Sequence, residues 1–309
     1  MSPSGSDGPA TPFRPSTLEE AATWLAAAGA AGRRVRIGED LVTDGLDRVL
    51  EHEAGDLTCA VEAGIRLSAL RDALAPHGQR LALDPPGDPT VGACLAANLT
   101  GPLRHRFGAP RDLVLGVTLV LADGTLASAG GKVVKNVAGY DLGKLACGSR
   151  GRLALIGRVS LRLHPVPPAR ATLVAEVDDV AAAVETLLGS QLQPSAVDVL
   201  HPGRVAVLFE GRQRAVDAQV ARARALIGGT EADGTVWDES RARQAAAAGV
   251  MRFAPADLRS VLGPLREAVA RPGPGVAYVP HLVGGVPSAA VRSLRRAVQQ
   301  RFDPRGTLA

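Results

Sequence analysis

Hydrophobic residues in the first half of the chain follow helical and strand periods in turn. Helical spacing predicts helices over 17–29 and 67–77, and Thr17 can cap the first of them. Short apolar runs predict four β-strands. Asp123-Gly124 can form a turn after the third of them, and a further strand would follow that turn. The four runs are 34–37, 57–63, 113–121 and 153–163. Helices mixed with strands in this way are typical of an α+β domain.

The pattern starts again after a proline cluster at 164–168, which is the best linker candidate in the chain. Beyond it we expect the order strand, helix, strand, strand, helix, strand, which is typical of ferredoxin-like domains. These six elements span 172–177, 180–188, 196–200, 205–209, 215–227 and 235–236. A looser region follows, and a final amphipathic helix is expected over 288–302.

The sequence therefore predicts two folded units, 16–165 and 169–309, both of the α+β class. A chain of 309 residues is long enough for two domains. Residues 1–15 are rich in Ser, Gly and Pro, so we predict a short disordered tail there.

Two glycine-rich segments of the first unit are the best candidates for chemistry. Residues 83–108 are expected to form a long loop, and long loops in compact domains are usually functional. The run Gly130–Leu142 follows a predicted strand, and its glycines allow backbone amides to approach an anionic or carbonyl-rich ligand. All three lysines and both asparagines of the chain lie between positions 98 and 144. Neither segment matches a Walker loop or a Rossmann fingerprint.

Composition excludes several classes of protein. The net charge of +4 is small and scattered, and aromatic residues make up only 3% of the chain, so nucleic-acid binding is not expected. Cys59, Cys94 and Cys147 are too widely spaced for a zinc motif or a disulfide framework, and no metal site is predicted. We find no apolar run long enough to span a membrane and no signal-peptide pattern, so a cytoplasmic location is expected.

The two glycine-rich segments resemble the FAD-binding domain of vanillyl-alcohol-oxidase-type flavoproteins, also called the PCMH type. Within them, Lys135–Leu142, KNVAGYDL, resembles the signature of the FAD-binding subunits of glycolate oxidase. The resemblance covers most of 18–165, including the stretch 45–53 and the segment Gly148–Leu153. Weaker traces continue to 302–304 near the end of the chain.

This resemblance implies two α+β lobes with FAD between them, followed by a ferredoxin-like α+β cap over the flavin ring. FAD is expected to be non-covalent, because no His or Cys stands out as an attachment point. The positions implied to contact the cofactor are Gly38 at the pyrophosphate, Pro86, Thr90, Gly92, Asn98, Gly101 and Gly108 in the middle, Lys135, Gly139, Tyr140 and Asp141 near the ribityl chain or ring, and Ile156 near adenine.

The chain departs from the resembled pattern at the pyrophosphate loop. Several successive glycines are expected there, but this chain has Gly38-Glu39-Asp40-Leu41. Two carboxylates beside a diphosphate are electrostatically unfavourable. The sequence leaves three alternatives open: fewer contacts to FAD, a lower affinity, or a site that has been lost.

Arg104, His105 and Arg106 are candidates for binding a substrate carboxylate, because a guanidinium group matches the geometry of a carboxylate. A solvated loop or a subunit contact would explain the same residues. His201 and His281 stand alone, and no catalytic base can be assigned from the sequence.

The resemblance implies an FAD-dependent oxidoreductase that is a subunit of a glycolate oxidase-like complex acting on a small 2-hydroxy acid. A larger homologous flavoprotein and an iron–sulfur subunit are the expected partners, and the complex could associate with a membrane. Two alternatives remain: a flavin-poor scaffold subunit, or a stand-alone FAD-dependent oxidoreductase acting on another substrate.

Overall fold

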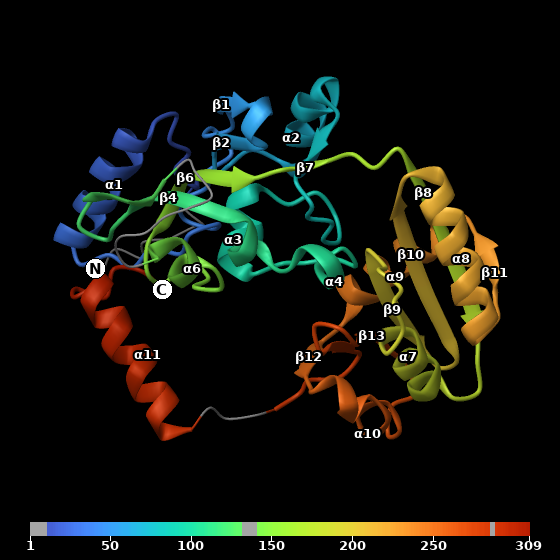
Figure 1. The fold of residues 1–309 in the computed structure, drawn as a ribbon. Coiled ribbons are helices and arrows are strands. Elements are labelled where there is room, and N and C mark those ends of the chain that lie inside the picture. Colours follow the sequence, from blue (N-terminus) through green and yellow to red (C-terminus); the bar gives the residue numbers. More distant parts are fainter. Residues whose placement is uncertain (1–10, 132–140, 285–287) are drawn as a thin grey trace.

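A computed structural model describes residues 11–131, 141–284 and 288–309. These residues form two α+β units side by side, joined near the proline cluster (Figure 1). The predicted α+β class and two-lobed architecture are confirmed. No helix in the described part of the chain is long and apolar enough to cross a bilayer.

The larger lobe of the first unit is built on a five-stranded antiparallel sheet in the order β1-β2-β6-β4-β5. Its strands are β1 (Val49–Glu53), β2 (Thr58–Glu62), β4 (Val114–Val120), β5 (Leu126–Gly130) and β6 (Leu155–Arg162). The helices that pack with it are α2 (Leu67–Leu74), α3 (Val91–Ala97), α5 (Pro110–Leu113) and α6 (Leu142–Ala146). Buried residues of α2, α3 and the strands share one core, which holds the loops between them in place.

The smaller lobe packs α1 (Leu18–Ala30) against three short parallel bridges. They join Phe13 with Leu41, Ile37 with Leu41, and Val35 with Leu308. The ring of Phe13 also stacks on Trp24 with centroids 5.0 Å apart. The predicted strand 34–37 is therefore reduced to single bridges, and residues 11–15 of the predicted disordered tail are ordered by these contacts; residues 1–10 lie outside the described part.

The end of the chain returns to this smaller lobe, although the sequence suggested that it belongs to the second unit. Helix α11 (Ala289–Phe302) leads back to the first unit, and both termini of the drawn ribbon lie there (Figure 1). Asp303 accepts hydrogen bonds from the amides of Thr307 and Leu308, at 2.9 and 2.6 Å. These bonds hold Leu308 where it can pair with Val35.

The cap is a seven-stranded sheet in the order β11-β8-β10-β9-β13-β14-β12. The first four strands and two helices form the ferredoxin-like arrangement predicted from the sequence. Its elements are β8 (Ala169–Glu176), α7 (Val180–Leu188), β9 (Ala196–His201), β10 (Arg204–Gly211), α8 (Gln213–Ile227) and β11 (Thr230–Ala232). The rest of the cap adds α9 (Thr235–Ala246), β12 (Gly249–Arg252), α10 (Leu258–Leu262), β13 (Ala268–Arg271) and β14 (Val276–Val279).

Helices cover the two faces of the cap sheet unequally. Helices α7, α8 and α10 share a core on one face. On the other face, Val236 and Trp237 of α9 pack with residues of β9 and β10. The predicted strand at 235–236 is thus wrong: these residues begin α9, because Val236 and Trp237 bury their side chains on a helical face.

The predicted loop 83–108 also contains structure. Thr90 caps α3 by accepting a hydrogen bond from the Ala93 amide at 3.1 Å, and α4 (Arg104–Phe107) follows. The linker at 164–168 is tied down as well, because β7 (His164–Pro165) pairs with β3 (Gln79–Arg80).

The two units meet along α4. Leu103 and Phe107 pack with a cap cluster that includes Leu200 and Trp237. Arg80 of the first unit also forms a two-pronged ion pair with Glu210 of β10, at 2.8 and 2.6 Å. This junction is therefore held by both apolar and charged contacts.

Candidate functional site

Two buried oxygen atoms without partners mark one end of a candidate cofactor site. Asn98 ends α3 in the left-handed conformation, with φ 52°, and its Oδ1 is buried without a hydrogen bond to any described residue. The same holds for Oγ of Ser149. The Gly148 amide donates a hydrogen bond to the Leu95 carbonyl at 2.9 Å, and the Arg150 amide donates one to the Ala96 carbonyl at 2.8 Å. These two bonds bring the segments of Asn98 and Ser149 together. Other buried polar atoms of the described residues also have no partner, but these two lie close together on the predicted cofactor loops and could bond to the polar atoms of a flavin.

The glycines predicted to line the cofactor also have a reason within the chain. A Cβ at Gly92 would lie 2.9 Å from the Ala63 carbonyl oxygen, and a Cβ at Gly101 would overlap the Asp84 carbonyl. Gly108 ends α4 with φ 81°. Close approach of the chain to itself therefore requires glycine at Gly92 and Gly101, whether or not a ligand also touches them.

The loop at Gly38 is closed on itself. Its amides are used internally: Gly38 donates to the Leu41 carbonyl at 2.8 Å, and Asp40 donates to the Arg36 carbonyl at 2.8 Å. The amide of Glu39 also donates to the Arg36 carbonyl, at 3.2 Å. The Arg36 amide and guanidinium both donate to the Asp40 carboxylate, which holds the pKa of that carboxyl below its usual range. No amide from Gly38 to Leu41 is left to donate to a diphosphate, so this loop does not fit that part of FAD, whereas the Asn98 and Ser149 end does fit a flavin.

The other predicted cofactor positions are spread over the larger lobe. Pro86 lies in the turn before Thr90. Asp141 caps α6 through the Lys144 amide at 2.9 Å, and Ile156 is buried in β6 opposite Leu119. Lys135, Gly139 and Tyr140 lie outside the described residues.

Of the three residues proposed for the substrate, Arg104 alone faces a polar junction between the units. Its Nη1 lies 3.5 Å from Oγ1 of Thr100, and the Tyr278 hydroxyl of β14 lies 3.5 Å from the same Oγ1. Burial lowers the pKa of Arg104, the Tyr278 hydroxyl raises it, and the charges of Arg252 and Arg271 lower it further. The charge of Asp112 acts in the opposite direction to these two arginines. Arg104 pairs with no carboxylate among the described residues. A half-buried cation without a paired carboxylate favours an anionic ligand.

The neighbours of Arg104 contact the cap directly. His105 packs against Gly273 of the cap, and burial lowers the pKa of its imidazole. Arg106 is exposed and donates to the Gln193 carbonyl at 3.3 Å, which ties the two units together.

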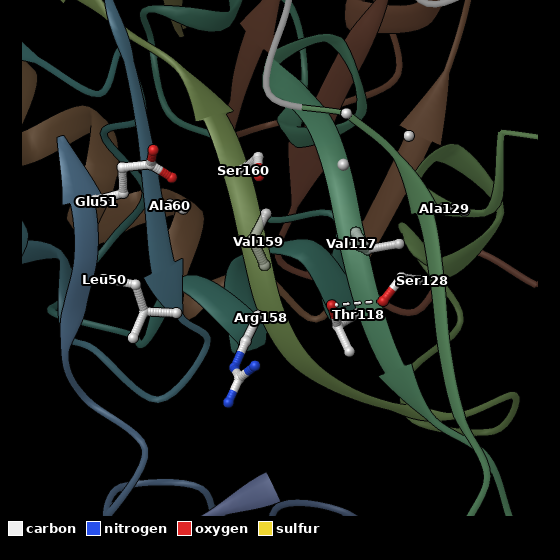
Figure 2. A pocket seen from close by; sticks show the side chains of 13 residues that line it. Leu50, Glu51, Ala60, Val117, Thr118, Ser128, Ala129, Arg158, Val159 and Ser160 are labelled. Atoms are coloured by element: carbon white, nitrogen blue, oxygen red, sulfur yellow. Dashed lines mark hydrogen bonds between the residues drawn. The ribbon is translucent and has the colours of Figure 1, made fainter. Parts of the chain in front are cut away.

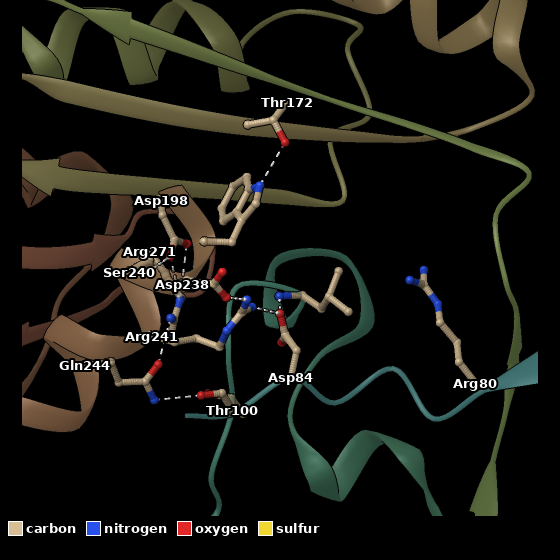
Figure 3. Close-up of polar contacts among 12 residues, drawn as sticks. Arg80, Asp84, Thr100, Thr172, Asp198, Asp238, Ser240, Arg241, Gln244 and Arg271 are labelled. Carbon is tan, nitrogen blue, oxygen red and sulfur yellow. Dashed lines mark hydrogen bonds and ion pairs between the residues drawn. The ribbon is translucent and has the colours of Figure 1, made fainter. Parts of the chain in front are cut away.

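A buried polar network lies behind the junction, and the sequence analysis missed it (Figure 3). Arg271 is fully buried and pairs with the fully buried Asp198 at 3.2 Å. The Arg271 guanidinium also donates to Gln244 of α9 at 2.8 Å, and Gln244 in turn donates to the Thr100 carbonyl at 2.7 Å. Ser240 donates to Asp198 as well. The network therefore connects the cap sheet, α9 and the loop that carries Thr100. Its members come from four distant stretches, so no local motif could have predicted it.

Asp84, which lies beside this network, has a carboxyl group whose pKa is close to neutral pH. Burial raises the pKa of its carboxyl to about 7, although Arg271 and the Leu103 amide lower it. The carboxylate accepts from the Leu103 amide at 3.1 Å, and Arg241 of α9 lies 3.6 Å away. A group of this kind gains its charge near neutral pH.

Asp84→Asn is expected to change how stability depends on pH. Because folding raises this pKa, the stabilisation from protonated Asp84 is complete below about pH 4 and is lost as the pH rises through about 7. Asparagine keeps an acceptor for the Leu103 amide and stays neutral. We expect the variant to gain about 4 kcal/mol relative to the parent between pH 4 and pH 8, since folding raises the pKa by about 3. Urea unfolding at both pH values measures this, and a difference that does not vary with pH would contradict it.

A separate pocket of about 330 Å³ lies on the face of the five-stranded sheet (Figure 2). Thr118 and Ser128 share a hydrogen bond of 3.0 Å there, and Arg158 lines the pocket with a buried Nε that has no described partner. Gly130 and Gly131 of the glycine-rich run line it, but none of the single positions expected to contact the cofactor or substrate does.

The described residues hold no metal cluster of three or more His, Cys, Asp or Glu side chains. His201 has a structural partner, because its Nε2 lies 2.9 Å from the Leu265 carbonyl oxygen. His281 is exposed. Neither histidine lies within a group of candidate metal ligands.

Part of the first unit matches a known family. Residues 27–130 match the family described as FAD binding domain. Glycolate oxidase subunit GlcE of Escherichia coli (strain K12) is 33% identical over 201 residues, which is 63% of this chain and 56% of that protein. Glycolate oxidase subunit GlcD of Bacillus subtilis (strain 168) is 31% identical over 160 residues, which is 50% of this chain and 34% of that protein.

Two further comparisons extend the similarity. The mitochondrial D-lactate dehydrogenase (cytochrome) 1 of Saccharomyces cerevisiae is 30% identical over 171 residues, which is 53% of this chain and 29% of that protein. A solved structure of alkyldihydroxyacetonephosphate synthase superposes with a TM-score of 0.72 at 16% identity, over 96% of this chain and 74% of that one. At that identity the match shows the fold alone.

The matched sequence relatives are longer proteins, and this chain spans at most 56% of those named above. Their names describe FAD-binding or hydroxy-acid-oxidising proteins, as the residue pattern suggested. Residues 27–130 therefore match an FAD binding domain, and the chain is similar to FAD-linked oxidoreductases and to glycolate oxidase subunits.

Proposed function

We propose that this chain is the FAD-binding subunit of a 2-hydroxy-acid dehydrogenase complex of the glycolate oxidase kind, with Arg104 as the anchor for the substrate carboxylate. The observation that carries the proposal is the half-buried Arg104 at the junction of the FAD domain and cap. It faces the hydroxyls of Thr100 and Tyr278 and has no carboxylate partner among the described residues. A small 2-hydroxy acid supplies the missing negative charge.

Each group at the junction has a separate task. The Arg104 guanidinium binds the substrate carboxylate, because its planar fork of N–H donors matches two carboxylate oxygens. The hydroxyls of Thr100 and Tyr278 are acceptors and donors for the substrate hydroxyl or its carboxylate. Asn98 and Ser149 orient the flavin through their buried oxygen atoms. When bound, FAD accepts the two electrons that the substrate loses.

A multi-subunit complex is the setting that the similarity to named subunits supports. A larger homologous flavoprotein and an iron–sulfur subunit would carry electrons onward. A cytoplasmic complex, or one held at a membrane by its partners, is consistent with a chain whose described helices do not span a bilayer.

A flavin-poor scaffold subunit is the second candidate, and the closed Gly38 loop favours it. The absorption spectrum of the purified chain, with any flavin released by heat and identified, separates the two. FAD near one per chain supports the first proposal. A colourless chain that takes up no added FAD supports the scaffold.

Arg104→Gln is expected to raise KM for the 2-hydroxy acid by about 100-fold, with a smaller change in kcat, because a uniform binding contact to the carboxylate is lost. Anaerobic reduction of the flavin in the purified complex measures both values. Arg106→Gln is the matched comparison on the same helix, since its guanidinium contacts Gln193, and we expect a change below about 3-fold. Equal effects of the two substitutions would contradict the role of Arg104.

A further inference from the structure

The segment Gly148–Leu153 lies between the flavin end of the site and the closed loop. Its Ser149 side chain is one of the two buried atoms without partners beside α3. Two residues further on, a Cβ at Gly151 would lie 3.0 Å from Cβ of Ile37, which directly precedes Gly38. A dinucleotide that extends from Asn98 and Ser149 toward the smaller lobe must therefore pass this segment.

The loop beyond Ile37 has little to offer an anion. Its amides are bonded internally, and Arg36 is already paired with Asp40 and Glu39. The diphosphate of FAD carries negative charge that needs donors or cations close by. Those groups have to come from another element.

Two arginines on the facing segment meet this need. Arg150 and Arg152 flank Gly151, and both are exposed. Neither has a carboxylate partner in the described ranges. Arg150 and Arg152 are thus two cations with no described ion pair, close to a loop whose own arginine, Arg36, is already paired.

The backbone conformation of Arg150 supports the same role. Arg150 adopts a left-handed conformation with φ 55°, between Gly148 at 84° and Gly151 at 75°. Glycine would take this conformation without strain, whereas arginine is disfavoured in it. Strained backbone of this kind is more frequent at functional sites than elsewhere.

We propose that Arg150 and Arg152 bind the diphosphate of FAD, in place of the loop at Gly38. The inference rests on the proposed binding of FAD. Guanidinium groups bind phosphate oxygens through paired N–H donors and are always charged. The chain would then recognise the phosphorylated part of the cofactor through side-chain charge, where a glycine-rich loop would use backbone amides.

The test compares three flavins on the full chain, freed of cofactor. Binding of riboflavin, FMN and FAD is followed by quenching of flavin fluorescence at low and high salt. The variant is Arg150→Asn with Arg152→Gln, because asparagine tolerates the left-handed backbone. Arg222→Gln on α8 of the cap is the control, since this arginine is also exposed and has no described partner.

We expect the parent chain and the control to bind FAD about 100-fold more tightly than riboflavin at low salt. The double variant should lose most of that preference and its salt dependence, while its affinity for riboflavin stays the same. Unchanged riboflavin binding also shows that the variant is folded.

Three results would overturn the inference: an FAD preference that survives in the double variant, a parent chain without any preference, or no binding of any flavin. The last result would also remove the proposed FAD-binding function. Arginine-dependent FAD binding in a complex that oxidises no 2-hydroxy acid would overturn the proposed function alone and leave this inference standing.

Discussion

Replacing Arg271 with methionine is expected to destabilise the protein by about 3–5 kcal/mol, the cost of leaving one partner of a buried ion pair alone. Asp198 is fully buried and would lose its cationic partner, and Gln244 would lose its donor. Because Gln244 connects α9 to Thr100, the same change should loosen the junction between the units. Urea unfolding of the purified chain measures the loss.

The matched control removes both charges. Arg271→Met combined with Asp198→Leu should recover a large part of the lost stability, because replacing a whole buried pair with apolar residues is often neutral or stabilising. A cost below about 1 kcal/mol for the single substitution would contradict this expectation. It would mean that the ion pair of Arg271 and Asp198 contributes little to the free energy of unfolding.

Gly101→Ala adds one methyl group near the site, and we expect it to destabilise the fold strongly. The new Cβ would overlap the carbonyl of Asp84, so the two segments of the loop would have to separate. We expect a loss of about 3 kcal/mol in unfolding free energy, at the upper end for overpacking. Flavin content should fall as well, because Gly101 precedes Arg104 and its carbonyl accepts the Arg104 amide at 3.2 Å.

Gly55→Ala is the control for this substitution. Nothing lies within 4 Å of a Cβ built at Gly55, so its effect should stay within about 0.5 kcal/mol. A Gly101→Ala chain that is as stable as the control and keeps its flavin would show that the Asp84 segment moves aside at little cost.

Periodicity predicted the elements that bury one continuous face. Helix α1 begins within one residue of its prediction because Thr17 caps it, and α7 matches its predicted range of 180–188. Three strands of the ferredoxin-like half, β8, β9 and β10, were found in the same way, whereas β11 was not. Tertiary contacts decided the elements that were missed: β1 is largely exposed, and it is held by pairing with β2 and by the contact of His52 with Gln79 of β3.

The candidate site was harder to predict, because a glycine pattern has two physical causes that look alike in a sequence. Gly92 and Gly101 were assigned to a ligand, but close approach to the chain itself already explains both. The resemblance correctly indicated the FAD family. It could not reveal Asp84, Asp198 or Arg271, whose importance depends on burial that no local pattern encodes.

The pairing of Leu308 with Val35 also affects how the cap can move. Since the chain leaves the first unit at 164–168 and returns to it at 303–309, the cap is in topological terms an insertion within its host. A body attached at two points can swing about the line that joins them, but it cannot rotate freely or drift away. We therefore expect any opening of the junction over Arg104 to be limited in extent, because the cap stays connected to the first unit at both ends.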